Sequence, residues 1–331
     1  METIRWGILG CGRIAKKFAA DLLLVSDAKL TAVAARQLEN AQAFAKEFPA
    51  PHVHGSYLEL VNNPEVDVIY IASPHALHHE HTLLCLNHKK AVLCEKAFAI
   101  NSRQVKEMVD LSRRNNVFLM EAIWTKFLPH YQKVQELISK GELGDIRNVL
   151  INFGFIPQPP VPPRLFDPAL GGGSLLDIGI YNVFMTISFL GRPDMIEASM
   201  EPSPEGVDMQ CAMLFKYKNG AMAQLFSSLS TNLALEADIS GTRSRIRLTS
   251  RFYAPSATIE LFPGREGSKQ LVPFHQEGGS GYQYEARHVG ECLRKGLTES
   301  PVMSHADSLL LMETLDRIRA AAGIVYTADK K

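Results

Sequence analysis

Closely spaced glycines follow a short apolar segment near the start of the chain, in the string Gly10-Cys11-Gly12-Arg13-Ile14-Ala15. The string has the form GxGxxA, one version of the fingerprint that binds the pyrophosphate of a dinucleotide. The first glycine permits a tight turn, the second lets a phosphate approach the backbone, and the N-terminus of the next helix faces the phosphates. We therefore predict a dinucleotide site that includes Gly10, Gly12, Arg13 and Ile14.

Arg36 is the residue type that decides between two dinucleotides. It ends the second apolar segment, where sites for NAD place an Asp or Glu about 20 residues after the glycines. A guanidinium suits a 2′-phosphate and does not replace the hydrogen bonds that a carboxylate accepts from two ribose hydroxyls. The sequence favours NADP as the cofactor, with NAD as the alternative if Arg36 is only a solvated residue.

Two further segments each follow an expected strand: Ser73-Pro74 follows strand 66–72, and Glu95-Lys96 follows strand 91–94. In a parallel sheet both would border the crevice at the carboxyl ends of the strands, so we expect all four residues at the cofactor. Near a positively charged nicotinamide, the pKa of the Lys96 ammonium would fall and the residue could exchange protons. The alternative for Lys96 is a surface lysine after a buried strand.

Four histidines lie close together after the third expected strand: His75, His78, His79 and His81. His75 and His79 have the i, i+4 spacing of a helical zinc pair. However, His75 directly follows Pro74 and there is no obvious acidic partner, so we predict no metal. We place His78 at the edge of the cofactor cleft and expect its neighbours to be solvated.

A second glycine-rich string, Gly171–Tyr181, leads into an apolar helix. Its three consecutive glycines permit unusual backbone angles and the close approach of a ligand. Asp177 and Tyr181 are four residues apart, so both project from one face of the helix. A carboxylate and a phenol on an otherwise apolar helix favour a substrate site, and the alternative is that they form hydrogen bonds within a domain interface.

The elements that must position these residues differ between the two parts of the chain. The first 120 residues alternate between short apolar segments and helix-like segments, which is typical of βαβ units and a parallel sheet. The expected strands are 4–10, 30–35, 66–72, 91–94 and 117–120, and the expected helices are 14–25, 38–48, 77–87 and 102–115. This pattern predicts a doubly wound α/β domain over residues 1–122.

Residues 123–331 show a different pattern, in which strands follow one another without intervening helices and so predict a mostly antiparallel sheet. Between them, Pro157–Pro163 contains prolines that exclude helix and central strand, and we interpret it as a stiff loop, either a surface crossover or a wall of a ligand cleft. The expected strands are 146–156, 194–200, 209–217, 221–228, 235–240, 243–249, 258–261 and 270–274, and the expected helices are 131–140, 174–190, 284–295 and 306–321.

Composition excludes several classes of protein. The 331 residues include 35 basic and 35 acidic side chains, so no net charge attracts nucleic acid or an anionic membrane. The five cysteines form no CxxC pair, which indicates a reduced compartment. The first residues leave no room for a signal peptide, and no apolar stretch reaches the ~18 residues of a membrane span. We expect a cytoplasmic protein whose partners are small molecules or a second copy of itself.

Together these strings resemble the glucose–fructose oxidoreductase/inositol dehydrogenase (Gfo/Idh/MocA) family over essentially the whole length. Within it, the chain is most similar to the dimeric dihydrodiol dehydrogenases, which also act as NADP-dependent D-xylose dehydrogenases. The strings that carry the resemblance are Ile4–Ile8, Val33–Arg36, Ala91–Lys96, Met120–Thr125, Leu176–Tyr181, Tyr284–Val289 and Glu291–Gly296.

The resemblance implies a Rossmann domain followed by an α/β domain whose open sheet commonly forms a dimer interface. It implies that Tyr181 is the acid/base, Lys96 its partner, and Asp177 a residue near the substrate. It also implies that Arg36 binds the 2′-phosphate and that Trp124 forms an aromatic wall of the substrate pocket. The family's usual triplet is Glu-Lys-Pro, whereas this chain has Ala97 after the lysine, and we expect Glu95 and its neighbours to keep Lys96 in place.

The expected function is hydride transfer between a nicotinamide and a carbinol carbon of a sugar or trans-dihydrodiol. Tyr181 would take the hydroxyl proton, and Lys96 would lower the phenol's pKa from its ordinary value of about 10. Asp177 would orient Lys96 or accept a substrate hydroxyl. Two alternatives are a redox-assisted glycosidase that retains NAD and a non-catalytic sensor that binds a dinucleotide.

Overall fold

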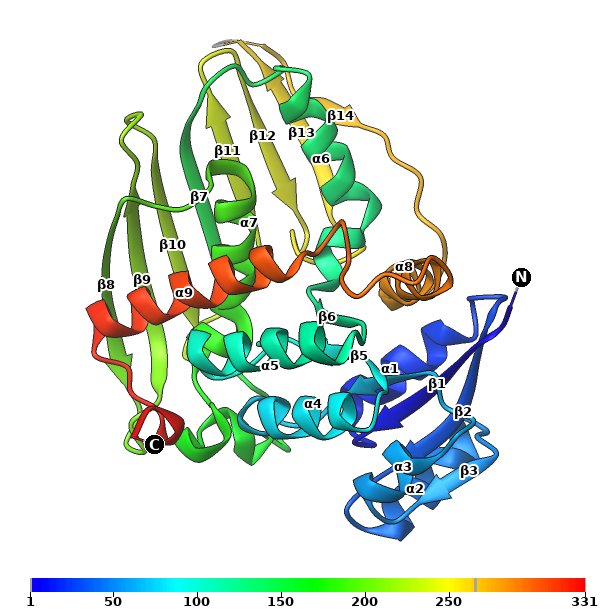
Figure 1. The fold of residues 1–331 in the computed structure, drawn as a ribbon. Helices are drawn as coiled ribbons and strands as arrows, with labels where there is room; N and C mark the ends of the chain where they lie inside the picture. The colour runs from blue at the N-terminus through cyan, green and yellow to red at the C-terminus, as the bar shows by residue number, and fades with distance from the viewer. Residues whose placement is uncertain (1, 265–266, 331) are drawn as a thin grey trace. The chain divides into compact units, whose positions relative to one another are not determined.

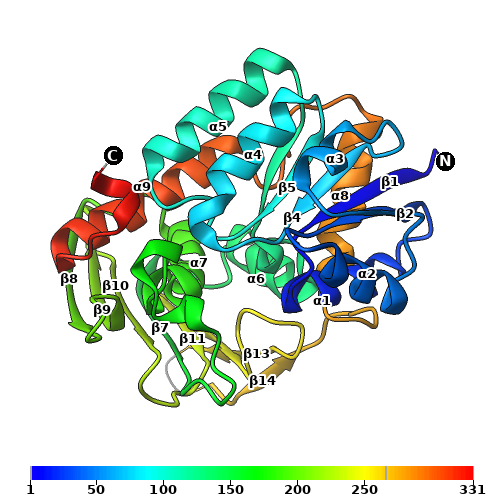
Figure 2. The ribbon, with the colours of Figure 1, turned by 90° about the horizontal axis from the view of Figure 1, so that it is seen from below.

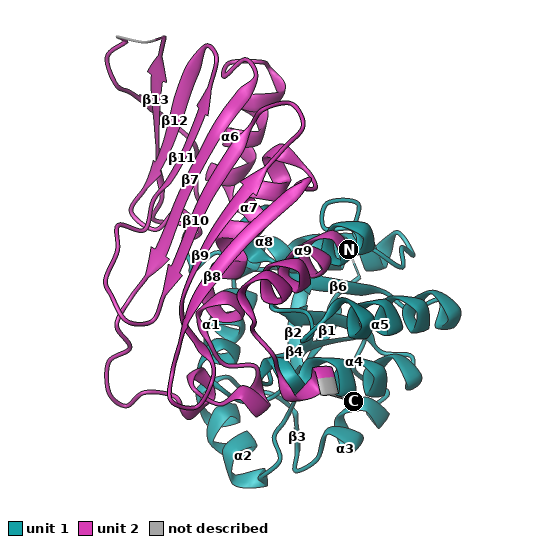
Figure 3. Cartoon of the chain, turned by 90° about the vertical axis from the view of Figure 1, so that its left-hand side faces the viewer, with its two compact units in different colours: residues 1–127, 277–309 teal, residues 128–276, 310–331 magenta. Residues whose placement is uncertain are grey.

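The protein is described by a computed structural model, which covers residues 2–264 and 267–330 and divides into two compact units. Figure 3 colours unit 1, residues 1–127 and 277–309, apart from unit 2, residues 128–276 and 310–331. The sequence predicts one boundary after residue 122, and the structure differs from it because residues 277–309 return to the first unit. This segment includes α8 (Tyr282–Arg294), which packs on α1.

Unit 1 is built on a parallel sheet with the strand order β3-β2-β1-β4-β5-β6 in the part of the chain that is described. Its strands are β1 (Ile4–Leu9), β2 (Ala28–Ala34), β3 (His52–His54), β4 (Val68–Ile71), β5 (Ala91–Glu95) and β6 (Leu119–Ala122). Its helices are α1 (Arg13–Leu22), α2 (Leu38–Glu47), α3 (Tyr57–Asn62), α4 (His78–Asn87) and α5 (Ser102–Asn115). The sequence predicts this doubly wound α/β fold correctly, but β3 and α3 were not predicted.

The strand order indicates where a ligand would bind on unit 1. Chain connections run outward in both directions from β1 and β4, so α1, α2 and α8 cover one face of the sheet while α3, α4 and α5 cover the other (Figures 1 and 2). Where such a sheet changes direction, the loops after neighbouring strands diverge and leave a crevice for a ligand. Gly10 follows β1 and Ser73 follows shortly after β4, at this point of the sheet.

Unit 2 contains a sheet with the order β14-β13-β12-β11-β7-β10-β9-β8 among the described strands. All neighbours are antiparallel except β7 and β10, which are parallel, so the expectation of a mostly antiparallel sheet is confirmed. The strands are β7 (Ile146–Gly154), β8 (Met195–Pro202), β9 (Asp208–Lys216), β10 (Met222–Ser228), β11 (Ala237–Gly241), β12 (Ser244–Thr249), β13 (Thr258–Pro263) and β14 (Gln270–Val272).

The two faces of this sheet differ in what covers them. On one face, α6 (Pro129–Ser139) and α7 (Ile180–Leu190) pack against the strands, and alternate residues such as Val149, Ala223 and Ile239 are completely buried. The residues between them point to the other face, where Leu150 pairs with Gln224 of β10 and Asp238 of β11. The last helix, α9 (His305–Ala322), begins in unit 1 and ends in unit 2.

One helical segment, 168–190, is long and apolar enough, by length and composition alone, to cross a membrane. The expectation that no apolar stretch reaches this length therefore fails for the segment. It contains the π-helical turn Leu175–Gly179 and α7, and 78% of its apolar window is buried in the structure, as in the core helix of a globular domain.

Candidate functional site

The glycine turn between β1 and α1 has the geometry that a bound pyrophosphate requires. Gly10 adopts φ +96°, and a Cβ there would lie 3.1 Å from the carbonyl oxygen of Ala72. Gly12 is the N-cap residue of α1, and a Cβ there would have no described atom within 4 Å. No described side chain caps α1 and no acidic residue occupies its first turn, so its N–H groups can receive a phosphate.

A polar cavity of about 700 Å³ lies beside this turn. Two exposed cations belong to its lining: Arg36, two residues after the end of β2, and Lys16 of α1. Lys16 was not predicted as a site residue, and its ammonium forms an ion pair with Glu47. Arg13 and Ile14 lie in the first turn of α1 but outside this lining. The complete lining is Cys11, Gly12, Lys16, Ala35, Arg36, Gln37, Asn40, Ala43, Phe44 and Tyr57.

His78 is buried rather than at the edge of a cleft. Its Nδ1 lies 2.7 Å from the carbonyl oxygen of Ala97 and its Nε2 lies 2.8 Å from that of Ser73, so the ring joins the segments that follow β5 and β4. Burial lowers the pKa of His78 to about 4, and the neutral ring donates to one of these carbonyls at a time. Through its contact with the carbonyl oxygen of Ser73, the buried His78 ring holds the backbone of Ser73 and Pro74 in place.

The other histidines of this cluster are also more buried than expected. His81 is 6% exposed and its Nδ1 lies 2.9 Å from the hydroxyl of Ser73, while His79 is half-buried and paired with Glu107 at 2.8 Å. His75 is buried as well. Among the residues the structure describes, no group of three or more His, Cys, Asp or Glu side chains could hold a metal ion.

Glu95 fixes the backbone at Lys96. One carboxylate oxygen accepts a hydrogen bond from the hydroxyl of Tyr70, and the other accepts from the backbone N–H of Lys96 at 3.2 Å. The Lys96–Ala97 peptide bond is cis. Glu95 is 7% exposed and Lys96 is half-buried. The buried side chain of Glu95 therefore holds the backbone of Lys96 in place through this hydrogen bond.

Two further buried carboxyl groups stand behind this segment and were not predicted. Burial raises the pKa of Glu121 to about 8, and its Oε1 accepts a hydrogen bond from the backbone N–H of Phe98 at 3.1 Å. Burial, together with the nearby charges of Glu95 and Asp21, raises the pKa of Glu285 well above its ordinary value. Burial therefore favours the protonated form of both carboxyl groups.

Trp124 lies in unit 1, in the 3₁₀ turn Trp124–Phe127. Its indole stacks on the ring of Tyr282 with centroids 4.6 Å apart and an interplanar angle of 4°. Tyr282 begins α8, and its backbone N–H donates to Asp21 at 2.8 Å. One face of the indole is thus covered by the segment that returns to unit 1, and the side chain is 7% exposed.

Asp177 and Tyr181 lie in unit 2, on the π-helical turn and on the first turn of α7. They are 8% and 7% exposed. Nη1 of Arg164 lies 2.9 Å from Oδ1 of Asp177, and this arginine was not predicted as a site residue. Isolated π turns inside helices occur frequently at functional sites because they shift side chains out of the regular helical pattern.

Aromatic rings surround Tyr181. Its ring centroid lies 5.1 Å from that of Tyr253 and 6.0 Å from that of Phe153, and the last two rings stack at 4.2 Å. Tyr253 lies between β12 and β13, far from the helix in sequence, so only the folded chain brings it to Tyr181. Burial raises the pKa of Tyr253, which therefore stays a neutral phenol at neutral pH.

The sequence predicts that the glycines before this helix allow a ligand to approach closely. In the structure, the groups that approach Gly172 and Gly173 belong to the protein itself. A Cβ on Gly172 would lie 2.7 Å from the carbonyl oxygen of Leu165, and one on Gly173 would lie 2.1 Å from Oδ1 of Asp208. Gly173 adopts φ +108° and donates a 2.8 Å hydrogen bond to Leu165. The glycines therefore let the proline-containing loop and β9 lie against the start of the helix.

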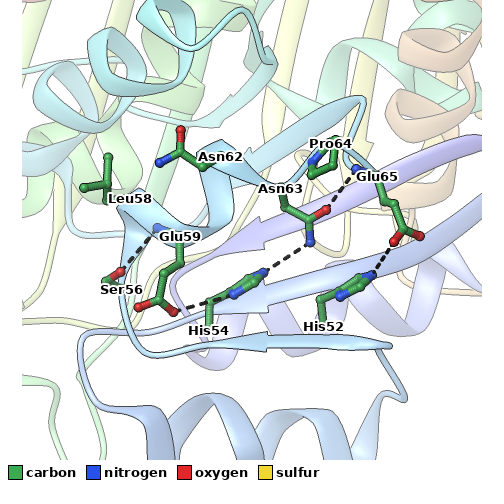
Figure 4. Close-up of a pocket in the computed structure, with 9 residues that line it drawn as sticks. All are labelled: His52, His54, Ser56, Leu58, Glu59, Asn62, Asn63, Pro64 and Glu65. Atoms are coloured by element: carbon green, nitrogen blue, oxygen red, sulfur yellow. Dashed lines mark hydrogen bonds and ion pairs between the residues drawn. The ribbon is translucent and has the colours of Figure 1, made fainter.

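A second cavity, of about 540 Å³, lies beside β3 and α3 in unit 1 (Figure 4). Its polar groups are paired with one another. Nε2 of His52 lies 3.1 Å from Glu65, Nδ1 of His54 lies 3.6 Å from Glu59, and Nε2 of His54 contacts the amide of Asn63 at 3.2 Å. These contacts fasten the edge strand β3 to α3 and the turn that follows it.

Comparison with known families accounts for both units. Residues 4–123 match the oxidoreductase family with an NAD-binding Rossmann fold, and residues 131–247 match the GFO/IDH/MocA C-terminal domain. The chain belongs to the GFO/IDH/MocA oxidoreductase family. It is an NAD(P)-dependent oxidoreductase that acts on carbinol carbons.

Relatives support this assignment over the full length. The chain is 40% identical to trans-1,2-dihydrobenzene-1,2-diol dehydrogenase of Mus musculus over 99% of this chain and 100% of that one. It is 37% identical to the Homo sapiens enzyme of the same name, again over 99% and 100%. These matches agree with the resemblance to dihydrodiol dehydrogenases inferred from the sequence.

Solved structures share the fold at lower identity. An aldose–aldose oxidoreductase from Caulobacter crescentus superposes with a TM-score of 0.89 at 23% identity, covering 97% of this chain and 98% of that one. A 3-ketoreductase from Actinomadura kijaniata, solved with NADP and TDP-benzene, superposes with a TM-score of 0.85 at 24% identity and the same coverage.

Proposed function

We propose that this family member is an NADP-dependent dehydrogenase that oxidises a carbinol carbon of a sugar or a trans-dihydrodiol. The observation that carries the proposal is the cavity beside the N-terminus of α1, whose lining includes Gly12, Lys16 and Arg36. It combines backbone N–H groups that suit a pyrophosphate with side-chain cations that suit one more phosphate. The printed name of the relatives, a dehydrogenase of a trans-1,2-diol, supports the substrate class.

The preference for NADP rests on charge. Arg36 occupies the position after β2 where an NAD site would present a carboxylate, and among the residues that line the cavity there is no Asp or Glu. A 2′-phosphate there would meet the guanidinium and could draw Lys16 away from Glu47. A ribose with two free hydroxyls would find no carboxylate to accept its hydrogen bonds.

Each residue singled out from the sequence has its own role in the proposed reaction. When bound, the nicotinamide ring accepts or donates the hydride. Tyr181 takes the hydroxyl proton during oxidation and returns it during reduction, and Lys96 supplies a positive charge that favours the ionised form of the acid/base. Asp177 holds a substrate hydroxyl, and Trp124 provides an apolar wall for the ring of the substrate. Glu95, which holds the backbone of Lys96, and His78, which holds Ser73, act as positioning residues.

We also propose that the protein works as a cytoplasmic homodimer, formed through the uncovered face of the sheet in unit 2, which is the face opposite to α6 and α7. This face presents Leu150 at 40% exposure, Met222 at 37%, Met195 at 51% and Leu271 at 68%. These exposed apolar side chains share the face with charged residues such as Asp238, Arg247 and Lys216, and a partner that covers the face would bury them. A second copy presents the same face and could bury it symmetrically.

The proposed activity is tested with a panel of aldoses, inositols and trans-dihydrodiols, assayed with NADP and with NAD by absorbance in the band of the reduced nicotinamide. We expect turnover with at least one sugar or trans-dihydrodiol and a higher kcat/KM for NADP than for NAD. A clear preference for NAD would contradict the role of Arg36. Absence of turnover with every member of the panel would contradict the substrate class.

A further inference from the structure

We propose that Arg164 determines substrate specificity by donating a hydrogen bond to the hydroxyl next to the one that is oxidised. The inference rests on the proposed function, because it takes Tyr181 as the residue that binds the reacting hydroxyl. It starts from the ion pair between Nη1 of Arg164 and Oδ1 of Asp177, which are 2.9 Å apart. Asp177 lies on the π-helical turn that leads directly into α7, four residues before Tyr181.

The loop that carries Arg164 is held close to this turn by its backbone. Gly173 donates a hydrogen bond to the carbonyl of Leu165 at 2.8 Å, and Gly172 donates to that of Asp167 at 3.0 Å. A Cβ on Gly172 would lie 2.8 Å from the carbonyl oxygen of Arg164 itself. Any other residue at position 172 would carry a Cβ that pushes the backbone of Arg164 and Leu165 away from the turn. The glycine run therefore explains how the loop brings a guanidinium to Asp177.

The guanidinium retains hydrogen-bonding capacity in this position. An arginine side chain has five N–H donors, and within the described residues Arg164 uses Nη1 on Asp177 and makes no other side-chain hydrogen bond. The Arg164 side chain is 35% exposed, whereas that of Asp177 is 11% exposed. Nε and Nη2 can therefore donate to an oxygen of a ligand that lies against the turn, while the carboxylate fixes the direction of the guanidinium.

The ion pair between Arg164 and Asp177 indicates which class of ligand Arg164 would bind. An unpaired guanidinium favours a carboxylate or phosphate, whereas Arg164 already pairs with the carboxylate of Asp177. The remaining N–H donors of a guanidinium that is already paired suit the oxygen of a neutral hydroxyl. A vicinal diol places a second hydroxyl next to the reacting one, and both sugars and trans-dihydrodiols have this feature. Arg164 would therefore favour a vicinal diol over an alcohol with a single hydroxyl.

The test compares R164M and R164K with the wild type and with R192M. Arg192 is a matched control, since it also forms an ion pair with a carboxylate of unit 2, that of Glu313. Two ligands are used: trans-1,2-cyclohexanediol as substrate, for which KM is measured, and cyclohexanol as competitor, for which the inhibition constant is measured. The binding of NADPH, followed by fluorescence, checks that each variant is folded.

In R164M we expect the KM of the diol to rise about 10- to 100-fold, the range of one lost charge-assisted hydrogen bond. The inhibition constant of cyclohexanol should change less than about threefold, because that ligand lacks the second hydroxyl. R164K should fall between R164M and the wild type, and R192M should match the wild type.

An equal loss for both ligands in R164M would show that Arg164 only supports the helix, and an unchanged KM for the diol would show that it does not contact substrate. Either result overturns the inference while the wild type still oxidises the diol. If the wild type fails to turn over any diol or sugar, the proposed function fails and the inference fails with it.

Discussion

Oδ2 of Asp208 lies 2.6 Å from the backbone nitrogen of Leu175. The same oxygen accepts a hydrogen bond from the hydroxyl of Ser174 at 2.8 Å. A buried carboxyl group at the start of β9 therefore caps the helical segment that carries Asp177, and burial raises its pKa to about 6. Because a side chain from a distant strand performs the capping, the start of this helix is fixed by tertiary structure.

Gly173→Ala should destabilise unit 2 by about 3 kcal/mol or more. The substitution places a Cβ 2.1 Å from Oδ1 of Asp208 and forces an L-residue into φ +108°, a conformation that alone costs roughly 1–2 kcal/mol. Chemical denaturation gives the loss in the free energy of unfolding. Gly206→Ala is the matched control, because Gly206 adopts φ +92° with no described atom within 4 Å of a Cβ. Equal losses in the two variants would contradict the steric role of Asp208.

The sequence predicts a helix over 174–190 that carries both Asp177 and Tyr181, because a helix of this length depends on local spacing. It does not predict Asp208, Arg164 or Tyr253, whose contacts with this helix are made across 13 to more than 70 residues of chain. Nothing in a hydrophobic period or a short motif specifies such contacts. The three glycines are a visible signal of close approach, but the sequence alone does not show that the approaching group is the protein's own backbone.

The same distinction applies in unit 1. The alternation of strands and helices and the glycine fingerprint are local, and both correctly predict the Rossmann sheet. The short elements β3 (His52–His54) and α3 (Tyr57–Asn62) were missed because three to six residues are too few to show a period. The return of residues 277–309 to unit 1 depends on contacts such as that between Tyr282 and Asp21, which are distant in sequence.

Arg36→Leu should weaken the use of NADP selectively. Removing the guanidinium leaves a 2′-phosphate without one charge-assisted partner, so the KM for NADP should rise about 10- to 100-fold while the KM for NAD stays within about threefold. Steady-state kinetics with both cofactors measure the change. Lys17→Met, next to Lys16 but outside the lining of the cavity, should leave both constants as in the wild type. Parallel increases for NADP and NAD would refute the assignment of Arg36 to the 2′-phosphate.

Tyr181→Phe should reduce kcat by ~10²–10⁴ because the variant has no group to exchange the proton of the reacting hydroxyl. The affinity for NADPH, measured by fluorescence titration, should remain within about twofold of the wild type. Tyr217→Phe removes a phenol of similar burial at the end of β9 and should retain wild-type kcat. Wild-type turnover in Tyr181→Phe would exclude the residue as the acid/base.

Leu150→Glu should convert the proposed dimer into monomers. Leu150 lies on a central strand of the uncovered face, so the substitution would bury a charge in each half of the interface. Light scattering after gel filtration should show the mass falling from twice to once the 36.7 kDa of the chain. Leu38→Glu is the matched control, since Leu38 is also 40% exposed but lies on α2 of unit 1. A wild-type protein that is already monomeric would rule out this interface.

Stability should fall as the pH is lowered from about 7 to about 4, because buried histidines stay neutral in the folded state. Burial lowers the pKa of His78 to about 4, whereas an unfolded histidine titrates near pH 6.5. Between these values the unfolded chain binds more protons than the folded one, so the free energy of unfolding rises with pH across this window and is lost on acidification. His81 and His130 have pKa values lowered by burial in the same way.

His78→Gln separates this effect from other causes of acid unfolding. At pH 5 the wild type should lose about 2 kcal/mol through His78, and the glutamine variant should lose correspondingly less between pH 7 and pH 5, although its stability at pH 7 is lower. Denaturation curves at the two pH values give the difference. His79→Gln is the control: it is the same substitution on the same helix, at a half-buried histidine that pairs with Glu107. If His78→Gln loses as much stability as the wild type on acidification, His78 is protonated in the folded state and donates to both Ser73 and Ala97.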